Sequence, residues 1–184
     1  MFNVIDEFNV LFSEDKTTLI KAPSSLAGEY IIPDCVTNIS NDAFYKCEKL
    51  EKIVLPPMLE SLGWRVFSGC NSLCSVVLPH NLISIGGYCF AGCKLLQQIT
   101  IPATTKHIGE YAFEGCSSLR EILIPTICSC DKYAFKACAA LESIQIPDTW
   151  NEIPSGLFYS CSGLEHIVLP VSVKSIGTYA FSNC

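Results

Sequence analysis

The sequence predicts a solenoid of stacked, nearly identical coils, each about 23 residues long. A cysteine follows each repeating phenylalanine by three residues, and a proline recurs with the same spacing. Three residue types that keep one period through most of the chain indicate a repeat architecture. The phenylalanines are separated by 23, 23, 23, 22, 23 and 23 residues and are Phe44, Phe67, Phe90, Phe113, Phe135, Phe158 and Phe181.

Each repeat contains a strand, a bend and a tight turn. Residues 119–124 alternate apolar and polar side chains with β-branched residues, which predicts a strand. The following Pro125 ends it, because proline has no N–H for the ladder. The Phe-to-Cys stretch has room for a single 3₁₀ or α turn only. A glycine stands four residues before the phenylalanine in several repeats, where we expect a positive φ: Gly63, Gly86, Gly109 and Gly177.

A unit this short cannot bury its own apolar face, so the coils must stack. Equivalent strands then pair in parallel at ~4.8 Å. The predicted fold has one parallel β-sheet on a strand face, with short 3₁₀ or α turns and irregular segments on the other side. The phenylalanines become an interior aromatic spine, and the cysteines form a second interior column.

The repeat defines the domain organisation. Residues 1–28 lack the period and are predicted to form an N-terminal cap, with a β-hairpin of 9–12 and 17–20 around the turn 13–16. Residues 29–184 are predicted to form the solenoid, with seven strand rungs. The last coil stops at Cys184 without a polar closing element. We therefore expect an open C-terminal end and a longer natural protein.

Composition excludes several function classes. The formal net charge of −6 over 184 residues argues against a nucleic-acid groove, which needs a positive field. No apolar run approaches the ~20 residues that cross a bilayer, so no transmembrane segment is expected. The first seven residues include two acids and no base, so no secretory signal is expected.

The twelve cysteines admit three interpretations. The spacings within 70–74, 89–93 and 128–130 could suit zinc. Neighbouring coils could also bring cysteines within disulfide range, although their Cβ vectors would run parallel instead of facing each other. We favour buried thiols that act as small hydrophobes, with no metal and no cofactor. Cys35, Cys74 and Cys128 fall outside the main columns and are predicted to be exposed, reactive thiols.

Catalysis finds little support. His80, His107 and His166 occupy different positions of the repeat and are not expected to converge. The chain has neither a Gly-rich phosphate loop nor a nucleophile elbow. We therefore expect a protein that is not an enzyme.

Two outward columns of the strand face are the candidate partner-binding surface. The first is unusually apolar for solvent, although β-propensity alone could explain its composition. Its candidate residues are Val54, Val77, Thr100, Leu123, Gln145 and Val168. The neighbouring column adds Lys52, Gln98, Glu121 and His166.

The repeat resembles the BspA-like leucine-rich repeats, as in Ile101-Pro102 followed by Ile108-Gly109-Glu110-Tyr111-Ala112-Phe113-Glu114-Gly115-Cys116. The resemblance implies a leucine-rich repeat solenoid. It also implies a surface-associated protein of mucosal bacteria or protists that adheres to host matrix proteins or cells. The predicted function is therefore a non-enzymatic protein-binding module at the cell surface.

An intracellular scaffold or self-assembly module is the alternative. A cysteine column that looks reduced and the absent signal sequence favour it and a cytoplasmic location. The expected partner is a protein in either case. Self-association through the open C-terminal end is a further expectation.

Overall fold

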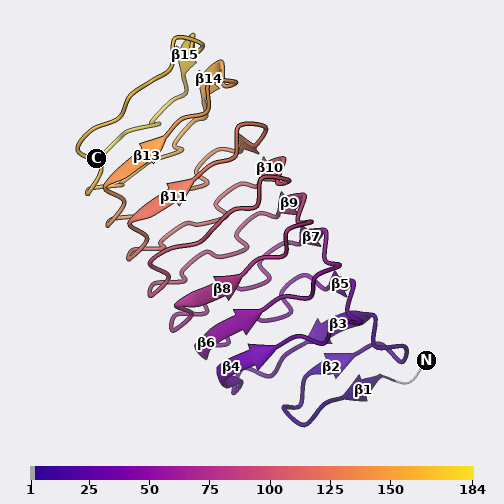
Figure 1. Ribbon diagram of the computed structural model, residues 1–184. Coiled ribbons are helices and arrows are strands. Elements are labelled where there is room, and N and C mark those ends of the chain that lie inside the picture. The colour runs from indigo at the N-terminus through magenta and orange to yellow at the C-terminus, as the bar shows by residue number, and fades with distance from the viewer. Residues whose placement is uncertain (1–2) are drawn as a thin grey trace.

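The computed structural model describes residues 3–184 as a stack of coils with the two termini at opposite ends (Figure 1). Each sequence repeat forms one coil, and we number the coils 1 to 7 by their phenylalanines, from Phe44 to Phe181. The predicted solenoid is confirmed. Within residues 3–184, no helix is long and apolar enough to cross a membrane.

The strand face follows one side of the stack (Figure 1). Its strands pair in parallel, β4 with β6, β6 with β8, and β11 with β13, and the register of β4 against β6 shifts once, between Gly28 and Glu29. The equivalent segments of coils 4 and 7, 98–100 and 166–168, form no regular strand. The strands are β4 (Ala27–Ile31), β6 (Lys49–Val54), β8 (Ser75–Val77), β11 (Glu121–Leu123) and β13 (Ser143–Gln145).

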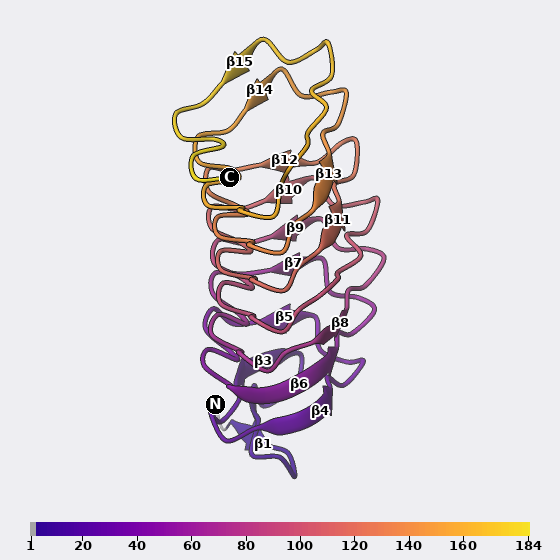
Figure 2. The same ribbon diagram turned by 90° about the vertical axis from the view of Figure 1, so that its left-hand side faces the viewer.

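A second column of strands runs parallel to the first along the stack (Figure 2). We predicted one parallel sheet, and the structure adds this second ladder. Each of its strands has only two residues, too few for a readable alternation of side chains. The strands are β5 (Asn38–Ile39), β7 (Ser61–Leu62), β9 (Ser84–Ile85), β10 (His107–Ile108), β12 (Ser129–Cys130), β14 (Glu152–Ile153) and β15 (Ser175–Ile176).

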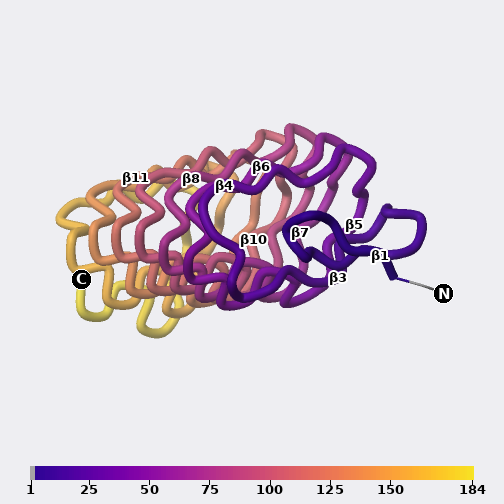
Figure 3. Tube along the Cα trace, turned by 90° about the horizontal axis from the view of Figure 1, so that it is seen from below, coloured from indigo at the N-terminus to yellow at the C-terminus, as the bar shows by residue number. Residues whose placement is uncertain are grey.

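An antiparallel element covers the N-terminal end of the stack (Figure 3). The strand β2 (Leu11–Phe12) pairs antiparallel with β1 (Val4–Ile5) on one side and with β3 (Thr18–Lys21) on the other. In turn, β3 pairs in parallel with β5 of coil 1. This pairing joins the antiparallel segment to β5, the first strand of the second column, whereas β7, β9, β10 and β12 form a separate sheet.

The core is one cluster that runs through all coils. Its largest members are the phenylalanines, which stack face to face with centroids 5.1–5.9 Å apart. Six of these rings are fully buried, and Phe181 at the open end is half-buried. Stacked rings at this spacing add to the free energy gained from burying their area.

Each coil turns back on itself through left-handed residues. Two positions per coil, two residues before and two residues after the phenylalanine, have a positive φ, as at Tyr111 (56°) and Gly115 (68°) in coil 4. The predicted positive φ at the glycine four residues before the phenylalanine is wrong. At Gly86 a Cβ would lie 2.6 Å from the carbonyl carbon and oxygen of Gly63. Glycine stands there because neighbouring backbones approach too closely for any side chain.

We expect Gly86→Ala to lower the free energy of unfolding by about 3 kcal/mol, the upper end of an overpacking cost. The added Cβ can be accommodated only if the coils separate, because all three of its nearest neighbours are backbone atoms. The control is Gly115→Ala, where the nearest atom is 3.9 Å away and only backbone strain of ~1 kcal/mol remains. Urea unfolding measures both, and equal losses would contradict the close-approach explanation.

Candidate functional site

The strand face gathers the residues predicted to bind a partner. Parallel pairing places Val77 beside Val54, and Gln145 beside Leu123. A single bridge aligns Gln98 with Glu121. Val54 is half-buried and the others are exposed. The face therefore presents together all ten candidates, Lys52, Val54, Val77, Gln98, Thr100, Glu121, Leu123, Gln145, His166 and Val168.

An apolar stripe runs along this face. The exposed fractions are 63% for Ile31, 55% for Val77, 67% for Leu123 and 84% for Val168. These side chains point away from the core on coils 1, 3, 5 and 7, because alternate residues of a strand face opposite sides of the sheet. On the coils between them the same position holds the half-buried Val54 and the exposed polar residues Thr100 and Gln145, so the four apolar side chains recur at every second coil.

The ladder of the strand face opens at its C-terminal end. The strand β13 pairs with β11 on one side, and the coil 7 segment on its other side forms no strand. A hollow of about 520 Å³ lies there, which we call the inter-coil groove. The core residues Ile144 and Ile146 lie at its floor. Its rim is formed by Ser143, Gln145, Asp148, His166, Val168 and Pro170.

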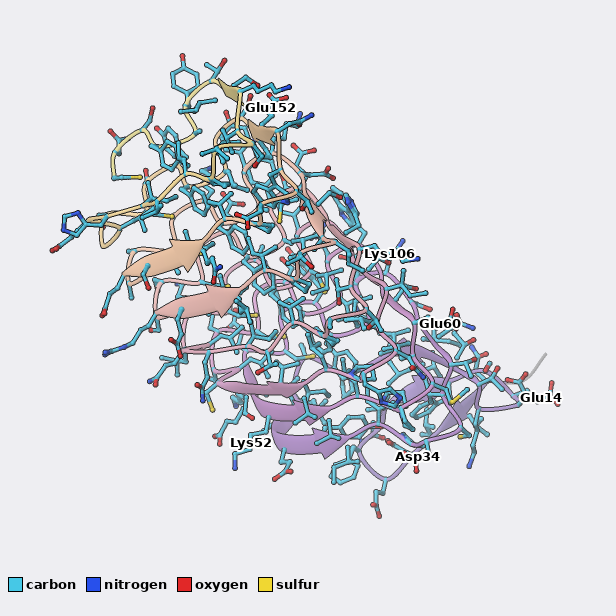
Figure 4. All side chains as sticks on the ribbon, turned by 45° about the horizontal axis from the view of Figure 1, so that its top comes forward. Glu14, Asp34, Lys52, Glu60, Lys106 and Glu152 are labelled. Atoms are coloured by element: carbon cyan, nitrogen blue, oxygen red, sulfur yellow. The ribbon has the colours of Figure 1, made fainter. Side chains whose placement is uncertain are left out.

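Charge is unevenly distributed over the surface. Figure 4 shows Lys52 beside the N-terminal strands of the strand face, whereas Glu60, Lys106 and Glu152 follow the other side of the stack. Ion pairs connect neighbouring coils outside the strand face, for example Lys136 with Glu114 at 2.8 Å and Lys132 with Glu110 at 3.4 Å. Such half-exposed pairs contribute little to stability.

The cysteines of the repeat form the predicted interior column. From coil 2 onward, each Sγ lies 3.1–3.3 Å from the carbonyl oxygen of the phenylalanine in the preceding coil and donates a hydrogen bond to it. Burial raises the pKa of Cys116 to about 12 and that of Cys93 well above its usual range. The thiols of Cys93 and Cys116 therefore act as buried, protonated donors.

The three off-column cysteines behave differently from one another. Cys35 and Cys74 are exposed, as predicted. The prediction for Cys128 is wrong, because this residue is 1% exposed. It stands three residues after Pro125, and the equivalent position holds Trp150 in the next coil. The shortened repeat hides this equivalence when positions are counted from the phenylalanine. All twelve cysteines are free, and within residues 3–184 no group of three or more ligand residues is arranged to hold a metal.

One polar cluster was missed by the sequence reasoning. His107 Nδ1 lies 3.2 Å from Ser129 Oγ, and His107 Nε2 lies 3.2 Å from Asp131 Oδ2. The pairing of β10 with β12 brings them together. The side chains of His107 and Asp131 are 44% and 50% exposed, so water competes for both contacts. The cluster links coils 4 and 5, and its half-exposed side chains are open to water.

Another missed feature is an aromatic column beside the phenylalanine spine. Tyr88, Tyr111 and Tyr133 stack with centroids 4.7–5.0 Å apart, and Trp64 contacts Tyr88 in a tilted arrangement at 5.0 Å. Lys136 covers the Tyr111 ring at 5.5 Å from its centroid. All three tyrosines precede a phenylalanine by two residues, a spacing that is visible in the sequence, and Trp64 precedes Phe67 by three. Because the ring faces contact one another, the column stabilises the stack of coils.

A family model assigns the repeat. The model described as the BspA type leucine-rich repeat region, in six copies, matches residues 22–130 and 84–184. The chain belongs to the BspA-type leucine-rich repeat family. This membership confirms the resemblance read from the repeat. No curated protein matches the chain.

Solved structures of bacterial leucine-rich repeat proteins share the fold of this BspA-type chain. One from T. pallidum is 27% identical, with a TM-score of 0.86, over 96% of this chain and 86% of its own. One from Eubacterium ventriosum is 27% identical, with a TM-score of 0.86, over 98% of this chain. One from Bacteroides ovatus is 30% identical, with a TM-score of 0.83, over 99% of this chain. The BspA-type chain spans 49% of the length of each of the last two.

Proposed function

We propose that the chain is a non-enzymatic protein-binding module that engages its partner through the strand face. The observation that carries this proposal is the exposed apolar stripe, with Val77 and Leu123 more than half exposed on a rigid stack. A rigid platform lowers the ordering cost of binding. The BspA-type family is associated with surface proteins, and this supports a cell-surface adhesin for host or matrix proteins.

The test replaces two residues of the stripe. We expect Val77→Lys with Leu123→Lys to lower the affinity for immobilised, purified matrix proteins at least tenfold while thermal unfolding is unchanged. A partner that packs on the apolar stripe would have to bury the two introduced lysine charges, and burying an unpaired charge costs free energy. The matched control is Ile83→Lys with Ile127→Lys, two exposed apolar residues outside the strand face, at 39% and 57% exposure. Binding by the stripe variant equal to that of the unaltered chain would reject this face.

The thiols favour a second candidate, an intracellular scaffold. The cysteine column donates S–H hydrogen bonds between coils, a role that requires reduced thiols, and the cytoplasm keeps thiols reduced. Labelling intact cells with an impermeant reagent separates the candidates. An adhesin is labelled before permeabilisation, and a cytoplasmic scaffold only afterwards.

Self-association would use the C-terminal end of the stack. Ile176 is 53% exposed there, whereas the equivalent Ile153 of coil 6 is fully buried. Tyr179 is 60% exposed on the same coil. A second copy that covers this end would bury these side chains. Sedimentation of the chain over a range of concentrations tests this, and a monomer throughout would exclude it.

A further inference from the structure

The inter-coil groove has core isoleucines at its floor, as does a hollow of about 380 Å³ over coils 4 to 6 of the same face, but the inter-coil groove is bordered by coil 7. In coils 5 and 6 the corresponding isoleucines, Ile122 and Ile144, are 5% and 8% exposed. In coil 7 the equivalent Ile167 is only half-buried, whereas Ile99 of coil 4, which also lies outside any regular strand, is 6% exposed. The groove is therefore an apolar recess of about 520 Å³, with the 84% exposed Val168 on its rim. Its size suits one large apolar side chain and part of the adjoining backbone.

The surroundings of the groove are acidic. Asp148 lines it, and Glu142 and Glu165 are exposed on the two coils that form it. None of these three carboxylates takes part in an ion pair within the described residues 3–184. By repeat position, the nearest positively charged residue on the strand face is Arg120 of coil 5. Lys49 and Lys52 lie on the same face in coil 2, far from the groove along the stack. An occupant with positive charge at both sides of an apolar group would complement this arrangement.

Taking recess and charge together, we propose that the inter-coil groove receives an apolar side chain of an extended segment rich in lysine or arginine on the protein partner. This inference rests on the proposed function of the strand face and adds the chemistry of the partner. The unpaired carboxylates attract and orient the cations, and the floor of Ile144 and Ile146 takes the apolar group out of water. An anionic partner such as nucleic acid is repelled by the same carboxylates.

Three labelled nine-residue peptides test the chemistry by fluorescence anisotropy with the 184-residue chain. One alternates lysine with leucine, one alternates lysine with serine, and one alternates glutamate with leucine. We expect the lysine–leucine peptide to bind at least tenfold more tightly than either of the others, with an affinity that falls as salt is raised. Equal binding of the lysine–serine peptide would show that the apolar side chain does not contribute and that the attraction is only electrostatic. Equal binding of the glutamate–leucine peptide would show that the positive charge does not contribute. Either result overturns the proposal.

Variants locate the site. We expect Asp148→Lys with Glu165→Lys to weaken the lysine–leucine peptide at least tenfold, and Val168→Ser to weaken it severalfold. The control, Glu29→Lys with Glu51→Lys, makes the same change in net charge at the N-terminal end of the same face, where both residues are exposed. If the control variant weakened binding of the lysine–leucine peptide equally, the assignment of the binding site to the inter-coil groove would be rejected. All altered residues are exposed, so folding is checked by circular dichroism.

The two proposals can fail separately. If the Val77→Lys, Leu123→Lys variant no longer binds matrix proteins and no peptide binds the unaltered chain, the proposed binding through the strand face is supported. The proposed occupant of the inter-coil groove is then rejected. If the peptide binds with the expected preferences while matrix proteins do not bind, the groove stands and the adhesive function is rejected.

Discussion

Replacing Phe113 by alanine is expected to lower the free energy of unfolding by about 3–5 kcal/mol. The ring is fully buried in the middle of the spine and stacks on both sides, with centroids 5.3 Å from Phe90 and 5.5 Å from Phe135. Its removal leaves a cavity between two coils that their own backbone hydrogen bonds hold at a fixed distance. Chemical denaturation of the variant and the unaltered chain measures the loss.

The matched variant is Phe181→Ala. This ring is half-buried and stacks on one side only, at 5.6 Å from Phe158. We expect it to lose less than half as much stability as Phe113→Ala, because in a one-dimensional stack a terminal coil has a single neighbour. Equal losses at the two positions would contradict stacking as the source of stability.

Raising the pH above about 9 is expected to destabilise the fold steeply. Burial raises the pKa of Cys47 to about 11 and of Cys116 to about 12, and it also raises the pKa of Cys93 well above its usual range. In the unfolded chain a thiol loses its proton near pH 8.5. Between these values the unfolded state binds fewer protons than the folded state, so stability falls as pH rises. Below the pKa of the unfolded thiols, both states are protonated and this loss of stability is absent.

The size of this effect follows from the number of thiols. At about pH 9.5 each buried thiol whose pKa is raised, such as Cys47, Cys93 and Cys116, opposes folding by up to ~1.4 kcal/mol, one pH unit above its unfolded pKa. Several such thiols would together remove most of a typical domain's stability. Urea unfolding at pH 7 and pH 9.5 measures the difference. Cys93→Ala is expected to flatten the pH dependence, and an unchanged slope would show that the column titrates as if it were exposed.

The period alone was sufficient to predict the interior. Because coils stack in register, equal positions of successive repeats become neighbours, and this places the phenylalanines and cysteines inside without any long-range information. Cys128 was misplaced because one residue is missing between Pro125 and Phe135, and counting from the proline would have put it inside. The reason for Gly86 was also missed, because close approach of two backbones depends on the spacing between coils.

The candidate site was predictable only in outline. Alternation along the strands identified Val77 and Leu123 as outward residues of one face. The inter-coil groove lies where strand pairing ends beyond β13, and no residue pattern in coil 7 signals that end. The contact of His107 with Ser129 and Asp131 depends on the second ladder, whose strands of two residues are too short to read.

The cysteine-to-carbonyl hydrogen bonds bear on how such a protein can change its length in evolution. The Phe67 carbonyl accepts from the Cys70 N–H of its own coil at 3.1 Å and from the Cys93 thiol of the next at 3.3 Å. Each added coil thus brings the donor that its predecessor needs and offers the acceptor that its successor will use. A duplication or deletion of one whole 23-residue unit would leave every such bond intact, so gene lengths can drift in steps of one repeat without new compensating mutations.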